Sequence, residues 1–137
     1  MVSTTSVNCL DEKGSPLVVD QKVPIGNTTQ AVDWSHAKDM VRGMFLMLQR
    51  APDDFILASG KLHTIAQLCQ IAFSAVGLDW KNHIKLDPAL GGTPNSPLPL
   101  VGDNSKAQEL LGWKPQISFE STVTEMVRFN VQALKRV

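Results

Sequence analysis

The fold class is decided by the stretch Phe55-Ile-Leu-Ala-Ser-Gly-Lys-Leu-His-Thr-Ile-Ala-Gln-Leu-Cys-Gln-Ile-Ala-Phe-Ser-Ala-Val-Gly77. Its first four residues are apolar, follow two aspartates and precede Gly60, which is typical of a short buried strand. From Thr64 onward the apolar positions recur at helical spacing, Thr64 and Gln67 form a capping box, and Gly77 supplies a left-handed C-terminal stop. The stretch predicts a strand over 55–58 and a helix over 64–76 in a mixed α and β domain.

Three further helices and several short strands are expected around this unit. The first helix carries an apolar stripe that we expect in the core, begins after Ser35 as its N-cap and ends near Arg50; its stripe is Ala37, Met40, Val41, Met44 and Leu48. Asp103 is the expected cap of a short helix ended by Gly112, and the last helix starts at Ser118 and runs to about residue 135. Short extended segments are expected at 17–19, 23–25, 80–86 and 100–101. The predicted fold class is α+β, derived from α/β: a small sheet of short strands packed with about four helices.

Composition narrows the possible functions. With 137 residues the chain is one domain, and 13 basic against 13 acidic residues argue against nucleic acid or an anionic membrane as partner. No stretch approaches the roughly 20 apolar residues that a membrane span needs. The start Met1-Val-Ser-Thr-Thr-Ser-Val7 lacks a basic and apolar signal, so the expected location is cytoplasmic. Cys9 and Cys69 are 60 positions apart and are expected to be reduced, with Cys69 an inert core residue.

No catalytic or metal-binding motif is apparent from residue types and spacing alone. Asp33, His36 and Asp39 are spaced as metal ligands could be, but turn, cap and first-turn roles explain them more simply. Ser35 is not in a nucleophile elbow. Gly91-Gly92 has no helix pattern after it and is expected in a loop rather than around a phosphate. We therefore predict no catalytic, cofactor-binding or metal residues.

From Val23 onward several blocks are familiar in order and spacing. They are Val23-Pro-Ile-Gly-Asn27, Asp33-Trp-Ser-His-Ala-Lys-Asp39, Pro52-Asp-Asp-Phe-Ile-Leu-Ala-Ser-Gly60, and Gly102-Asp-Asn-Ser-Lys-Ala107 with Leu111-Gly-Trp-Lys-Pro115. They resemble the C-terminal, substrate-side lobe of GDP-mannose 4,6-dehydratases, which are extended short-chain dehydrogenase/reductases acting on nucleotide sugars. The resemblance implies a family-unrelated segment over 1–22 and a single lobe of that kind over 23–137.

Parts of the family pattern are missing from this chain. The family holds NADP on a Gly-rich turn of an N-terminal Rossmann half, where a Tyr-x-x-x-Lys pair handles the proton, but this chain has no such turn and no tyrosine. Where the family has a basic pair, this chain has Ala31-Val32, and where the family has a substrate-holding arginine, it has residues 93–96. Loss of these basic side chains removes hydrogen bonds worth about 1.5–3 kcal/mol each. The resemblance implies that this chain binds no cofactor. It also implies a remnant substrate pocket lined by Gly26, Asn27, Asp33 and Trp34; for Asp33 and Trp34 a fold-holding role in a turn is the alternative.

Three hypotheses follow for the function. The first is a stand-alone, non-catalytic lobe that acts as a binding or interaction module, whose exposed apolar face is covered by residues 1–22 or by a second copy in a homo-oligomer. The second is the substrate-side half of a split NADP-dependent nucleotide-sugar dehydratase, completed by a separate Rossmann-domain chain. The third is weak binding of a nucleotide sugar without chemistry.

Overall fold

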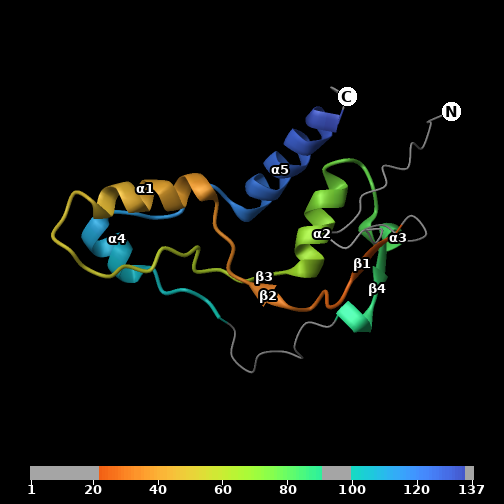
Figure 1. The fold of residues 1–137 in the computed structure, drawn as a ribbon, viewed down its shortest axis with the longest axis horizontal. Helices are drawn as coiled ribbons and strands as arrows, with labels where there is room; N and C mark the ends of the chain where they lie inside the picture. Colours follow the sequence, from red (N-terminus) through yellow and green to blue (C-terminus); the bar gives the residue numbers. More distant parts are fainter. Residues whose placement is uncertain (1–21, 91–99, 135–137) are drawn as a thin grey trace.

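The computed structural model describes residues 22–90 and 100–134 (Figure 1). The expected α+β class is confirmed. In chain order the elements are β1 (Val23–Ile25), β2 (Ala31–Val32), α1 (Ala37–Met47), β3 (His63–Thr64), α2 (Ile65–Ser74), α3 (Trp80–His83), β4 (Ile84–Leu86), a 3-10 turn (Pro88–Leu90), α4 (Ser105–Leu111) and α5 (Phe119–Leu134). Among the helices of these residues, none combines the length and apolarity that crossing a membrane requires.

The described strands form two separate two-stranded sheets. β1 pairs in parallel with β4, with Val23 opposite Ile84, and β2 pairs antiparallel with β3, with Ala31 opposite Thr64. Pro24 fits in β1 because a two-stranded sheet has an outer edge on which a missing N–H group is not needed. The expected strand at this position is confirmed.

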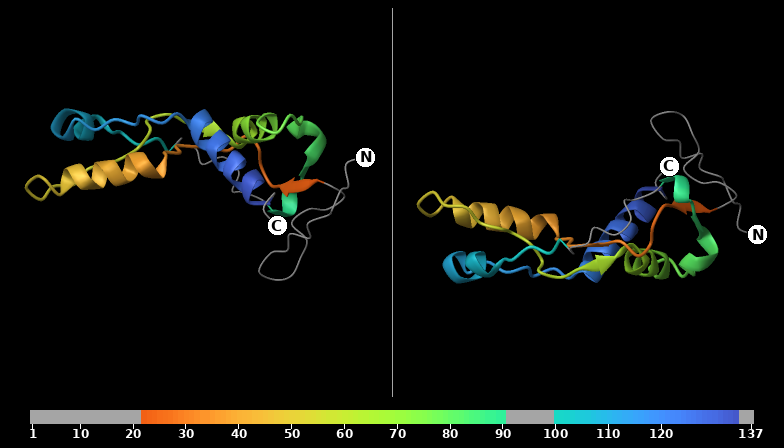
Figure 2. Two further views of the ribbon diagram at one scale, coloured as in Figure 1. Left: turned by 90° about the horizontal axis from the view of Figure 1, so that it is seen from above. Right: turned by 90° about the horizontal axis from the view of Figure 1, so that it is seen from below.

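The elements are spread along an elongated molecule (Figure 1, Figure 2). α1 and α4 lie side by side at one end, α2 and α5 pack together in the middle, and the β1–β4 sheet with α3 forms the other end. The segments that join these groups run through the middle of the molecule, and the candidate site described below lies there.

α2 matches its prediction closely. The Thr64 hydroxyl accepts a hydrogen bond from the Gln67 N–H at 3.1 Å, and the Gln67 side chain accepts one from the Thr64 N–H at 2.9 Å. The helix ends at Ser74, three residues before Gly77, whose φ of 74° is the expected left-handed conformation. Cys69 is 4% exposed, which confirms its place in the core.

The expected N-cap and end of α1 are both wrong. His36, not Ser35, is the N-cap, and its Nδ1 accepts a hydrogen bond from the Lys38 N–H at 3.1 Å. The imidazole can take this role because a neutral ring nitrogen is an acceptor like the hydroxyl of a serine. The helix ends at Met47, before the turn that contains Arg50.

The apolar stripe expected in the core lies instead largely on the surface of α1. Val41, Met44 and Leu48 are 63%, 57% and 81% exposed. The cause is Gly43, which is buried and lets the helix backbone approach its neighbours: a Cβ added there would lie 2.5 Å from Leu57 Cδ1. Because α1 packs through this glycine side, the stripe on the opposite side faces away from the chain.

The core at this end of the molecule is built around Trp113, which is 1% exposed. Its Nε1 donates a hydrogen bond to the backbone oxygen of Asp39 at 2.7 Å. Ala107 of α4 is fully buried close by in the chain, and Gly112 has the expected left-handed conformation, with φ of 63°. α4 begins at Ser105, with Asn104 rather than Asp103 in the cap position.

Two predicted strands are not formed. Residues 55–58 and 100–101 pair with no strand in the described part of the chain, and Ile56 is 56% exposed. A strand needs a hydrogen-bonded neighbour, which the described residues do not provide. Residues 80–86, expected to be extended throughout, fold as α3 followed by β4, because Asp79 caps a short helix by accepting from the Lys81 N–H. The expected segment at 17–19 lies outside the described residues.

Candidate functional site

Asp33 joins three segments that lie far apart in the sequence. Its Oδ1 accepts hydrogen bonds from the Ser59 N–H at 2.9 Å and the Ser59 hydroxyl at 2.5 Å. Its Oδ2 accepts from the N–H groups of Gly60 at 3.0 Å and Gly102 at 3.2 Å. Burial acts to raise the pKa of Asp33, but the bonds from the Ser59 hydroxyl and the three backbone amides outweigh it and hold the pKa below its ordinary value. Four protein donors therefore satisfy this carboxylate, which supports the fold-holding alternative for Asp33.

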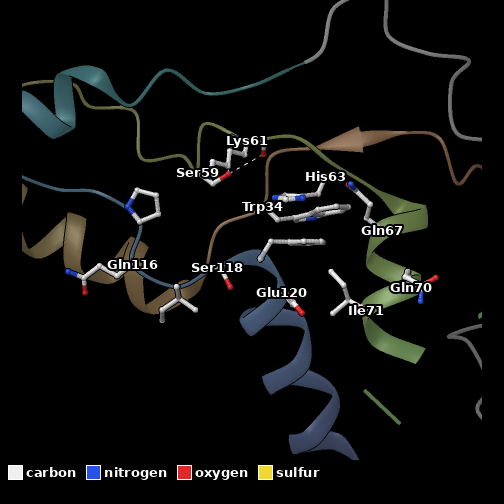
Figure 3. A pocket seen from close by; sticks show the side chains of 13 residues that line it. Trp34, Ser59, Lys61, His63, Gln67, Gln70, Ile71, Gln116, Ser118 and Glu120 are labelled. Atoms are coloured by element: carbon white, nitrogen blue, oxygen red, sulfur yellow. Dashed lines mark hydrogen bonds between the residues drawn. The ribbon is translucent and has the colours of Figure 1, made fainter. Parts of the chain in front are cut away.

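A cavity of about 600 Å³ lies beside this junction, between α2 and the start of α5 (Figure 3). The Phe119 ring stacks on two other rings that line the cavity. The centroid distance to His63 is 4.1 Å with an interplanar angle of 11°, and the distance to Trp34 is 5.3 Å with an angle of 10°. We call the cavity that these three rings line the aromatic cavity. Its most developed feature is a stack of ring faces, which suits contact with flat or apolar groups.

Several polar groups at the aromatic cavity already have protein partners. Gln67 is engaged in the cap of α2, and the Gln70 side chain accepts a hydrogen bond from Trp80 Nε1 at 2.9 Å. The Ser118 hydroxyl accepts from the Ser121 N–H at 3.1 Å and so caps α5. These three side chains therefore have structural roles.

A second carboxylate, Asp39, is 3% exposed and also has a structural role. Its Oδ2 accepts from the N–H groups of Gln116 and Ile117, both at 2.9 Å, and its Oδ1 lies 3.2 Å from the Arg42 guanidinium. Within residues 22–90 and 100–134, no group of three His, Cys, Asp or Glu side chains could hold a metal ion. His36, the third residue of the metal alternative, caps α1 and has its Nε2 3.5 Å from Glu125.

The four residues expected to line a remnant substrate pocket are not all together. Trp34 lines the aromatic cavity, and Asp33 binds Ser59, which also lines it. Gly26 and Asn27 are not among its lining residues; the Asn27 side chain accepts hydrogen bonds from the N–H and hydroxyl of Thr29, both at 2.8 Å, in a local turn. Substrate binding by the four remains a prediction.

Three residues that complete the cavity were not predicted from the sequence. Lys61, His63 and Phe119 come from the loop before β3, from β3 and from α5, and all three line it. His63 and Phe119 are 56 positions apart in the chain, so no local sequence pattern indicates that their side chains meet in one cavity.

The outer side of α1 is a second surface of interest, because it carries several exposed apolar side chains. Val41, Met44, Phe45 and Leu48 are 63%, 57%, 62% and 81% exposed, and we call them the outer α1 face. The opposite side of the same helix is packed through Gly43. A helix that is apolar on both sides is typical of one held between two layers of a larger structure. In this chain only one of the two sides is covered by the described residues.

Comparison with known proteins identifies the relatives of this chain. The family model described as GDP-mannose 4,6 dehydratase matches residues 17–126. GDP-mannose 4,6 dehydratase 1 of Arabidopsis thaliana is 40% identical over 116 residues, covering 84% of this chain and 32% of that protein. The human GDP-mannose 4,6 dehydratase is 33% identical over 129 residues, covering 81% of this chain and 34% of that protein. Among solved structures, dTDP-glucose 4,6-dehydratase from Bacillus anthracis has a TM-score of 0.70 at 17% identity and covers 82% of this chain and 35% of its own, which shows a shared fold.

The chain thus spans about a third of the length of the curated relatives it matches. The family model covers well over half of the chain, and its match includes Asp33, Asp39 and the residues that line the aromatic cavity. This chain belongs to the GDP-mannose 4,6 dehydratase family.

Proposed function

We propose that this chain is a non-catalytic interaction lobe of the dehydratase family, which docks through the outer α1 face onto a separate protein domain. The observation that carries the proposal is the exposure of Phe45 and Leu48, 62% and 81%, on a helix that is packed on its other side. Contiguous exposed apolar side chains on a soluble protein mark interaction surfaces. The chain contains no tyrosine, so the phenol of the family's Tyr-x-x-x-Lys pair is absent and catalysis by the chain alone is not expected.

The partner that best fits is a Rossmann-type domain, because the chain matches about a third of its relatives' length. NADP would then be bound by the partner and not by this chain. In the alternative function, the assembled pair is a split dehydratase with activity on a nucleotide sugar. Turnover of GDP-mannose by the mixed chains, absent from either alone, would favour the split enzyme over the non-catalytic lobe.

The test of docking is complex formation with the Rossmann half of the Arabidopsis relative, measured by light scattering and calorimetry. Phe45→Glu and Leu48→Glu place a charge on the outer α1 face and should weaken the complex at least about tenfold, because burying an unpaired charge is costly. Phe129→Glu is the matched control, since Phe129 is 71% exposed on α5. Equal loss in all three variants, or no complex with the wild-type chain, would contradict the proposal. A complex formed only between copies of this chain would identify a homo-oligomer instead.

A second candidate function is weak binding of a nucleotide sugar in the aromatic cavity. It is favoured by Trp34, a predicted ligand residue that lines this cavity beside the stacked Phe119. Calorimetry with GDP and GDP-mannose tests it, and Trp34→Leu should abolish the heat of binding. No heat with the wild-type chain at millimolar ligand would exclude this function.

A further inference from the structure

One side of α5 carries a row of side chains at the spacing of a helix-pairing contact. The row consists of Thr122, Met126, Phe129 and Ala133, separated by four, three and four positions, and we call it the α5 seam. Met126 and Phe129 at its centre are 61% and 71% exposed. Alternate spacings of three and four place side chains on one stripe of a helix, which is the pattern of the contact positions in coiled coils.

The α5 seam is not the side through which α5 packs within its own chain. The packed side is marked by Val123, which is 5% exposed, and by the half-buried Val127 and Val131, which follow it at four-residue spacing. This side belongs to the helix that packs with α2 in the middle of the molecule (Figure 1). The apolar surface of α5 is therefore wider than the part that the described residues cover.

Two polar side chains on and beside the α5 seam have hydrogen bonds within the helix. The Thr122 hydroxyl donates to the Ser118 backbone oxygen at 2.9 Å, and the Asn130 side-chain NH₂ group donates to the Met126 backbone oxygen at 2.8 Å. The Thr122 methyl group is left for apolar contact. A partner can cover the seam without leaving these two donor groups unpaired, which lowers the cost of removing water from it.

We infer that the α5 seam pairs with the α5 seam of a second copy of this chain, in antiparallel orientation about a two-fold axis. In this arrangement Met126 of each copy lies against Phe129 of the other, and Thr122 lies against Ala133, because both pairs of positions are centred between residues 127 and 128. Every seam position then meets another seam position, as a two-fold contact between identical surfaces requires. The inference goes beyond the proposed function, which uses the outer α1 face.

The charges of α5 favour the antiparallel orientation. Glu120 and Glu125 lie in the first half of the helix, Arg128 lies in the second half, and the sequence continues with Lys135-Arg136. The Lys38 ammonium lies 3.2 Å from Glu125 and offsets part of its charge. Antiparallel pairing places the acidic half of one helix opposite the basic half of the other and aligns their dipoles in opposition, whereas parallel pairing places like charges together.

Sedimentation equilibrium of the full chain, without any other protein, tests the pairing. The seam is small, so we expect a weak dimer with a dissociation constant of about 100 µM. Phe129→Glu should raise this constant at least about tenfold, because it places an unpaired charge at the centre of the contact. Phe45→Glu is the matched control: it makes the same substitution at a 62% exposed position of the outer α1 face and should change the constant less than about twofold.

The folded state of both variants is checked by circular dichroism, and both phenylalanines are exposed, so neither change disturbs the core. A chain that stays monomeric at about 1 mM would overturn the inference. A dimer on which Phe129→Glu has no larger effect than Phe45→Glu would also overturn it, because the contact would then lie outside the α5 seam.

Cysteine cross-linking tests the orientation. Thr122→Cys and Ala133→Cys chains are prepared with Cys9→Ser, while Cys69 is 4% exposed and can remain. With oxidised glutathione, a mixture of the two chains should give a disulfide-linked dimer, and each chain alone should give little, since only the mixture brings two new thiols together. Linkage of each chain alone as readily as the mixture would overturn the antiparallel seam. These experiments contain no Rossmann half, so their failure would leave docking through the outer α1 face unaffected.

Discussion

Replacing Asp33 with asparagine should lower the free energy of unfolding by about 2–4 kcal/mol near pH 7. Asparagine has the same shape, and its oxygen can still accept from the N–H and hydroxyl of Ser59. Its NH₂ group cannot accept from the amides of Gly60 and Gly102, so two bonds to a charged acceptor are lost, each worth about 1.5–3 kcal/mol. The side chain is only partly buried, and water that replaces these bonds reduces the expected loss below their sum.

The stabilisation that Asp33 provides should decrease as the pH is lowered. The pKa of Asp33 is lowered in the folded state, so its contribution is complete above the unfolded pKa, about 3.8, and is lost as the pH falls through the lower folded pKa. The difference in stability between the wild-type chain and Asp33→Asn should therefore shrink below about pH 4, because asparagine does not titrate.

Urea unfolding curves followed by tryptophan fluorescence, recorded at several pH values, provide the measurement. Asp103→Asn is the matched control, because Asp103 is exposed and, among the described residues, accepts only from Ser105, two positions further along the chain. Asp103→Asn should change stability by less than about 0.5 kcal/mol. If Asp33→Asn is as stable as the wild-type chain, or if their difference stays constant as the pH falls well below 4, these hydrogen bonds do not stabilise the fold as predicted.

Three further substitutions test the packing. Gly102→Ala should destabilise the fold by about 1–3 kcal/mol, because the new Cβ would lie 2.3 Å from Ala58 Cβ; a neutral effect in urea unfolding would show that this contact is looser. Trp113→Phe should cost about 2–4 kcal/mol in the same assay, because it leaves a cavity and removes the hydrogen bond from the indole N–H to the Asp39 backbone oxygen, and a cost under 1 kcal/mol would argue against that bond. Thr64→Ala should cost about 1 kcal/mol through loss of the α2 cap, with Thr64→Ser close to neutral as its control, and equal costs would contradict the cap.

The parts of the fold that could be predicted are those decided by neighbouring residues. α2 is an example, since its cap lies three residues from its partner and its apolar stripe is continuous. The same reasoning failed for α1, which has apolar residues on both sides. Only the contact of Gly43 with Leu57 and Trp113 decides which side is packed, and these three residues are distant in the sequence.

The site was less predictable than the fold because it depends on contacts between distant segments. Trp34 was expected at a pocket, but its cavity is completed by residues of α2 and α5 that have no shared sequence signal. The strand expected at 55–58 failed for a different reason. Its apolar run was recognised correctly, but strand formation also needs a partner, which the described residues do not contain.

The hydrogen bonds that Asp33 and Asp39 accept from distant segments have a consequence for folding kinetics. Asp39 accepts a hydrogen bond from Ile117, 78 positions away, and Asp33 from Gly102, 69 positions away. Contacts of this separation require the closure of large loops and should form after the transition state. We therefore expect Asp39→Asn to accelerate unfolding while leaving the refolding rate almost unchanged, which stopped-flow measurements can verify. A slower refolding rate would place this junction in the folding nucleus. A chain under synthesis that does not yet contain residue 117 cannot form the hydrogen bond between Ile117 and Asp39. If this bond forms late and slows unfolding, the lobe resists unfolding only after residue 117 has been synthesised.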